Sequence, residues 1–150
     1  MAQAETKSTT NIDQLNSFLR GEISAVETYR IALDNLGADH PGRNALGSCK
    51  SSHVQRVLAL QTKVRALGGS PSEGSGPWGA LVTAYESGAA VLGDQAVIAA
   101  LEQGEDHGLA DYRADLDKLD ADSRQLVTAV LLPQQVETHE VIRKLANGRS

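Results

Sequence analysis

Apolar residues recur every three or four positions through most of the chain, and this spacing predicts four main helices. The four predicted helices cover about residues 11–36, 43–67, 80–120 and 122–147. No stretch alternates between apolar and polar residues as a half-buried strand does. The pattern therefore predicts an all-α protein.

The expected connections between these helices are short, long and short, as in a bundle of two helical hairpins joined by a long crossover. Residues 68–79, GGSPSEGSGPWG, are too rich in Gly, Pro and Ser for a helix and predict the crossover. Trp78 at its end is expected to pack this loop onto the bundle. Residues 1–10 are polar and predict a flexible tail before a single domain, residues 11–150.

Local signals predict where the helices begin and break. The first helix is expected to start near the capping residues Asn11 or Asp13, and the last at Asp122 or Ser123. Gly88 and Gly93 are candidate breaks in the third predicted helix, and Pro133 should kink the fourth or interrupt its hydrogen bonds.

Composition narrows the class of protein. A chain of 150 residues can bury a sizeable core in one domain. Its net charge of -5, with no basic cluster, argues against a nucleic-acid partner, and no apolar run is long enough to cross a membrane. The single cysteine, Cys49, excludes an internal disulfide and fits the reducing cytoplasm, where we expect the protein as a homodimer.

Four ionisable side chains occupy inward-facing positions, one in each predicted helix: Glu22, His53, Glu105 and His139. The glutamates belong to an internal repeat. Residues 21–33 (GEISAVETYRIAL) and 104–116 (GEDHGLADYRADL) share Gly-Glu, six residues, Tyr-Arg, two residues and Leu. Burying an unpaired charge is costly, so four such positions imply compensating partners.

Helix geometry allows each glutamate to meet a histidine. At ~1.5 Å per residue, Glu22 and His53 lie ~22 and ~17 Å from their shared turn, and Glu105 and His139 lie ~23 and ~25 Å from theirs. Two carboxylates and two imidazoles in a dry interior are suitable ligands for iron, zinc, manganese or copper. The residues expected to support such ligands from the same helix faces are Tyr29, Cys49, Tyr112 and Gln135.

This arrangement resembles the ferritin-like superfamily. Glu-x-x-Ala-x-x-x-Tyr, beginning at Glu22, is similar to the first helix of rubrerythrin-type proteins. Gly-Glu with Tyr112 seven residues later is similar to their third helix. The resemblance covers most of residues 11–147, and LRGEISAVETYRIAL and LLPQQVETHE are similar to an uncharacterised bacterial branch. It implies a ferritin-like four-helix bundle with a metal-binding role.

The chain departs from the di-iron pattern, which takes one Glu from each of two helices and Glu-x-x-His from each of the other two. Lys50 and Val136 stand where that pattern has the glutamates that precede His53 and His139. Six ligands therefore fall to four, and one metal ion or none is expected.

Three functions remain open from the sequence. The first is a ferritin-like protein that binds a transition metal for storage, stress response or sensing. The second is a metal-free structural or interaction bundle with a vestigial di-iron site, whose polar residues fix the register of the helices. The third is a ferritin-like oxidoreductase, for which the sequence assigns no catalytic residue.

Overall fold

The computed structural model describes residues 2–74, 76–86 and 93–148. Its long helices are α1 (Ala2–Asn35), α2 (Arg43–Ala66), α4 (Asp94–Ala114) and α6 (Leu132–Ala146). Its shorter elements are α3 (Gly79–Glu86), the 3-10 turn η1 (Leu116–Lys118), α5 (Ala121–Leu126) and the π-helix η2 (Val127–Leu131). Within the described ranges no residue forms a strand.

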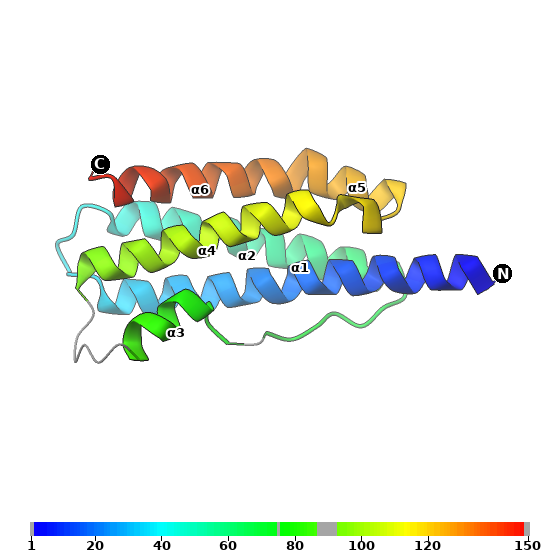
Figure 1. Ribbon diagram of the computed structural model, residues 1–150, viewed down its shortest axis with the longest axis horizontal. Helices are drawn as coiled ribbons and strands as arrows, with labels where there is room; N and C mark the ends of the chain where they lie inside the picture. Colours follow the sequence, from blue (N-terminus) through cyan, green and yellow to red (C-terminus); the bar gives the residue numbers. More distant parts are fainter. Residues whose placement is uncertain (1, 75, 87–92, 149–150) are drawn as a thin grey trace.

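The long helices lie side by side as four rods (Figure 1). Helices α1 and α2 form one hairpin, while α4 packs against the last rod, which α5, η2 and α6 build end to end. The crossover returns along the length of the bundle to α3, which packs on α4. The predicted all-α four-helix bundle of two hairpins joined by a long crossover is confirmed.

Helix α1 begins earlier than the sequence pattern predicts. It starts at Ala2, so residues 2–10 are helical, and the predicted boundary near Asn11 is wrong. Asn11 instead ties α1 to the start of the last rod. Its Nδ2 donates to Asp120 Oδ2 and Ser123 Oγ, both at 3.1 Å, and its Oδ1 accepts from the Asp120 amide at 2.9 Å. The flexibility expected of the tail stays a prediction.

The start of the last rod also differs from the prediction. Asp120 is the N-cap, because its Oδ1 accepts from the Ser123 amide at 2.8 Å, whereas Asp122 or Ser123 was expected in that role. The predicted interruption near Pro133 is confirmed, since the π-helix η2 directly precedes it. A proline lacks the amide hydrogen and collides with the carbonyl four residues earlier, and a π-turn relieves both problems. Helix α4 begins after Gly93, as predicted. Gly88 lies outside the described residues.

Hydrogen bonds attach the crossover to α1 along its length. Asn16 Nδ2 donates to the Ser70 carbonyl at 3.1 Å, and Asn16 Oδ1 accepts from the Ser72 amide at 2.8 Å. Further along, the Trp78 amide donates to Thr28 Oγ1 at 2.7 Å. These contacts place the end of the loop beside the middle of the bundle.

Trp78 packs the loop onto the bundle, as predicted. Its ring centre lies 6.0 Å from that of Tyr29 and 5.9 Å from that of His53, both in edge-on geometry. The indole also covers Gly104 so closely that a Cβ there would overlap the ring. Gly104 therefore allows α4 and the crossover to approach each other.

The core consists of two apolar clusters. One contains Tyr29, Ala32, Leu36, Leu46, Cys49, Leu81, Val97, Ile98, Ala100, Leu101 and Ile142. The other contains Leu15, Phe18, Leu19, Leu60, Val64, Tyr112, Leu119, Val127 and Leu131. Buried polar side chains lie between them along the helices. In the part of the chain that the structure describes, no helix is long and apolar enough to cross a membrane.

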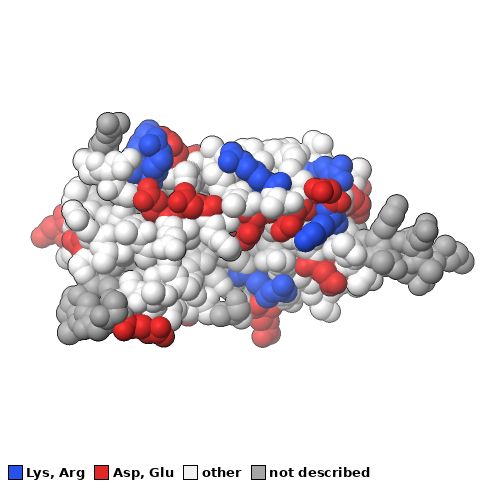
Figure 2. All heavy atoms as spheres, viewed as in Figure 1, with Lys and Arg blue, Asp and Glu red and all other residues white. Residues whose placement is uncertain are grey.

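The surface of the rods carries charged side chains of both signs (Figure 2). On the face shown in Figure 2, acidic side chains gather along α4 and α6, with basic ones among them. The side chains of Asp111 on α4 and of the Arg143–Glu140 pair on α6 are about half exposed.

Candidate functional site: a buried polar layer

Six polar side chains, all nearly inaccessible to solvent, meet between the two apolar clusters. We call this set the polar layer; it comprises Glu22 from α1, His53 and Arg56 from α2, Glu105 from α4, and Gln135 and Thr138 from α6. Each of the four rods contributes at least one member. The layer thus crosses the whole bundle at one height.

His53 bridges the two glutamates of the internal repeat. Its Nδ1 lies 2.6 Å from Glu22 Oε2 and its Nε2 lies 2.7 Å from Glu105 Oε2. Ionised carboxylates only accept hydrogen bonds, so an imidazole bonded to both donates from both nitrogens and is positively charged. Burial by itself lowers the pKa of His53. The charge of Glu22 and the hydrogen bonds to both glutamates outweigh burial and raise that pKa from its ordinary 6.5.

Arg56 places a second cation inside the layer. Its Nη1 donates to Glu22 Oε1 at 3.2 Å and, through a short contact, to Gln135 Oε1. Its Nη2 donates to Thr138 Oγ1 at 3.0 Å and to Ser52 Oγ at 3.2 Å. The guanidinium therefore connects α2 to both α1 and α6.

Glu105 accepts hydrogen bonds from four described side chains. Besides His53, it receives Thr138 Oγ1 at 2.7 Å, Gln135 Nε2 at 3.0 Å and the Tyr29 hydroxyl at 2.7 Å. Burial opposes ionisation of this carboxyl. The hydrogen bond and charge of His53, with the hydrogen bonds from Thr138 and Tyr29, nevertheless lower the pKa of Glu105 below its ordinary 4.5.

The two repeat tyrosines exchange partners between the halves of the chain. Tyr29 of the first repeat donates to Glu105 of the second, and Tyr112 of the second donates to Glu22 of the first, each at 2.7 Å. Burial, followed by the charge of the glutamate each one contacts, raises the pKa of both phenols well above 10.0. Both tyrosines therefore remain neutral donors to the carboxylates.

His139 does not join the other three residues predicted as metal ligands. Its side chain is 20% exposed, and its Nε2 pairs with Oδ1 of Asp106 on α4, whose side chain is 62% exposed. Thr138, the preceding residue, faces the interior instead. The expectation of an inward-facing His139 is therefore wrong, while Glu22, His53 and Glu105 do converge.

Cys49, predicted as a supporting residue, is buried among apolar side chains one turn before His53. Burial, followed by the nearby charge of Glu105, raises the pKa of its thiol to about 12. The residue is a neutral thiol at physiological pH, and a metal-binding thiolate is disfavoured.

Arg56 and Thr138 belong to the polar layer but were not predicted from the sequence. Strict alternation of three and four residues from Leu46 leads through positions 49 and 53 to Arg56, but an apolar residue, Val57, follows directly and fits a core position by its chemistry. The same alternation from Gln135 leads to Thr138 rather than His139. The spacing thus indicated both residues as inward-facing, but the chemistry of their side chains favoured the neighbouring positions.

A dinuclear carboxylate centre of the di-iron pattern does not fit this layer. Such a centre needs four carboxylates, and only Glu22 and Glu105 are present. Both carboxylates are already bonded to His53, and Arg56 holds a positive charge 3.2 Å from Glu22. Among the described residues, no three His, Cys, Asp or Glu side chains are arranged to hold a metal ion.

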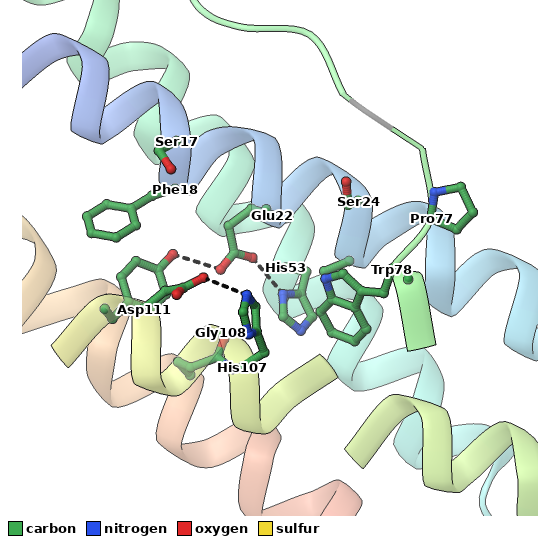
Figure 3. Close-up of a pocket in the computed structure, with 15 residues that line it drawn as sticks. Ser17, Phe18, Glu22, Ser24, His53, Pro77, Trp78, His107, Gly108 and Asp111 are labelled. Carbon is green, nitrogen blue, oxygen red and sulfur yellow. Dashed lines mark hydrogen bonds and ion pairs between the residues drawn. The ribbon is translucent and has the colours of Figure 1, made fainter. Parts of the chain in front are cut away.

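A cavity of ≈ 290 Å³ reaches the layer from the side of α1, α4 and the crossover. Glu22 and His53 contribute to its wall, beside Trp78 (Figure 3). His107 and Asp111, whose side chains are largely exposed, also line it, with His107 Nε2 at 3.3 Å from Asp111 Oδ2. The polar layer is therefore buried but reachable.

Comparisons with known proteins identify the family and the fold. Residues 10–118 match the family described as a domain of unknown function, DUF2383, and the chain belongs to that family. A curated protein with a significantly similar sequence is not found.

Two solved structures share the fold. One, from Bacillus anthracis str. Ames, belongs to the ferritin-like, diiron-carboxylate proteins; it has a TM-score of 0.70 and 19% identity, covering 93% of this chain and 97% of that one. The other is a conserved hypothetical protein from Mycobacterium tuberculosis, with a TM-score of 0.76 and 14% identity, covering 96% of this chain and 95% of that one. The predicted ferritin-like fold is confirmed.

Proposed function

We propose that this chain works as a metal-independent ferritin-like bundle, a structural or interaction module whose interior is held together by the polar layer. The observation that carries the proposal is the buried guanidinium of Arg56, bonded to Glu22, Gln135 and Thr138. Arg56 supplies, from within the chain, the positive charge that a metal ion would otherwise bring to the carboxylates.

Charge balance supports the proposal. Two ionised glutamates and two cations, the imidazolium of His53 and the guanidinium of Arg56, give the layer no net charge. A buried ion pair stabilises a fold little compared with apolar residues, but removing one partner costs much, so such layers serve mainly to fix register. The neighbour from Bacillus anthracis is named for a diiron-carboxylate centre, whereas this chain balances its carboxylates with side chains.

Elemental analysis tests the proposal, using protein purified without added metal. We expect no stoichiometric transition metal, and no increase in melting temperature with zinc, ferrous, manganous or cupric ions. A specific site at a hundredfold excess of metal over Kd would raise the melting temperature by roughly 5–10 °C for a domain of this size. Stoichiometric metal in the wild-type protein, or a shift of that size, would overturn the proposal.

An Arg56→Met variant sharpens the test. Removing the guanidinium leaves two carboxylates and one imidazole with a net negative charge, which is the donor set that a divalent ion prefers. We expect this variant, unlike the wild type, to gain thermal stability from zinc. An Arg65→Met variant, changed at an exposed position of the same helix, is the matched control. A zinc response equal in both variants would argue against Arg56 as the internal cation.

The second candidate is a protein that binds a single transition metal through Glu22, His53 and Glu105. The cavity favours it, because an ion could reach Glu22 and His53 from solvent. Such an ion would have to replace the protons that His53 shares with both glutamates, so its binding would release protons. The same elemental analysis decides between the two candidates.

A further inference from the structure

The cavity beside the polar layer is lined by aromatic and polar side chains, as small-molecule binding sites are. Three aromatic rings line it, from Phe18, Trp78 and Tyr112. Figure 3 shows Glu22 between Phe18 and Trp78. Its volume of ≈ 290 Å³ lies at the lower end of the range of ligand pockets.

Glu22 retains acceptor capacity that Glu105 lacks. A carboxylate has about four positions that accept hydrogen bonds. Glu105 uses four, from His53, Tyr29, Thr138 and Gln135, and does not line the cavity. Glu22 lines the cavity and accepts only three described bonds, from His53, Tyr112 and Arg56. Its fourth position is therefore available to a donor that enters the cavity.

The charges of the wall favour a cation among possible donors. The acidic side chains are Glu22 and Asp111, and none of the described lining residues is Lys or Arg. Aromatic rings attract cations through their negative faces, and three of them surround this space. An anion would meet two carboxylates, and the positively charged His53 in the wall already donates both of its N–H groups, to Glu22 and Glu105.

Gly21 keeps part of the cavity open. It lines the wall on α1, one residue before Glu22, and a Cβ added there would meet no atom within 4 Å. A side chain added at this position therefore starts in open space at the cavity wall. Gly21 thus offers a way to block the cavity while leaving the polar layer intact.

We propose that this cavity binds a small organic ammonium ion, whose N–H group donates to the free acceptor position of Glu22 while its apolar part packs against Trp78 and Phe18. The inference goes beyond the proposed function and rests on it in one respect, since Glu22 must be free of metal. The occupant is a small molecule rather than a macromolecule, because the polar end of the site lies inside the bundle.

Trp78 provides the assay, because it is the only tryptophan and lies in the cavity wall. Its fluorescence is titrated with benzylammonium, benzyl alcohol and benzoate, which share a ring and differ in charge, in buffer containing EDTA. We expect saturable binding of benzylammonium, at least about tenfold weaker binding of benzyl alcohol, and none of benzoate. Equal affinity for the ammonium and the alcohol, or binding of benzoate, would overturn the proposal.

Two variants locate the binding. Gly21→Leu is expected to weaken benzylammonium binding at least about tenfold by filling the cavity. Gly47→Leu makes the same change at an open helical position of α2 outside the cavity and should bind like the wild type. Wild-type affinity in Gly21→Leu, confirmed as folded by circular dichroism, would exclude this cavity. Because EDTA removes bound metal, this result is independent of the elemental analysis that tests the proposed function.

Discussion

Replacing Arg56 by methionine should destabilise the fold more than any surface substitution. The change removes the donor of four described hydrogen bonds, to Glu22, Gln135, Thr138 and Ser52, and leaves the polar layer with a net negative charge. Removing one partner of a buried ion pair costs about 3–5 kcal/mol. That cost is a large part of the total stability of about 5–15 kcal/mol for a native domain.

A second substitution isolates the electrostatic part of this cost. Glu22→Gln removes one negative charge, so the Glu22→Gln, Arg56→Met double variant has a neutral layer again. We expect the sum of the two single losses in unfolding free energy to exceed the loss in the double variant by about 1–3 kcal/mol. Arg65→Met, at an exposed position of α2, should stay within about 0.5 kcal/mol of the wild type.

Urea unfolding followed by far-UV circular dichroism measures these free energies by linear extrapolation. The reasoning is refuted if Arg56→Met costs less than about 1 kcal/mol, since no buried pair would then have been broken. Additivity of the two single variants within about 0.5 kcal/mol would equally show that Arg56 and Glu22 do not interact.

Three further outcomes follow from the same geometry. The free energy of unfolding should fall as pH rises through the raised pKa of His53, above 6.5, and as pH falls through the lowered pKa of Glu105, below 4.5. Urea unfolding midpoints measured across this pH range check both changes. A midpoint that does not vary with pH would contradict the ion pairs of His53 with the two glutamates. His139→Ala should cost no more than about 1 kcal/mol, because its pair with Asp106 is solvent-exposed, and a larger loss in urea unfolding would place it in the core. Gly104→Ala should lower the free energy of unfolding by more than about 1 kcal/mol, because the added Cβ overlaps the indole of Trp78. Gly47→Ala, at an open helical position, should raise it by about 0.5–1 kcal/mol. Equal shifts of the melting temperature in the two variants would contradict this difference.

Most of the fold could be predicted from the sequence, because helix formation and apolar periodicity are local properties. The end of α2, the crossover, the break at Gly93 and the disturbance near Pro133 all appear where composition and spacing indicate. The start of α1 at Ala2 could not be predicted. The polar residues before Asn11 suggested a flexible tail, although nothing in them forbids a helix. Its extension depends on a helix that packing further along already stabilises.

The candidate site, too, could be predicted from the sequence only in part. Glu22, His53 and Glu105 could be identified from sequence, because a charged residue in an apolar stripe must find a partner, and the repeat relates the two glutamates. Tertiary structure decided between Arg56 and Val57, and between Thr138 and His139. At 3.6 residues per turn, two adjacent positions can straddle the inward direction, and the rotation of each helix against its neighbours selects one of them. That rotation turned an expected Glu/His metal layer into a layer with its own internal cation.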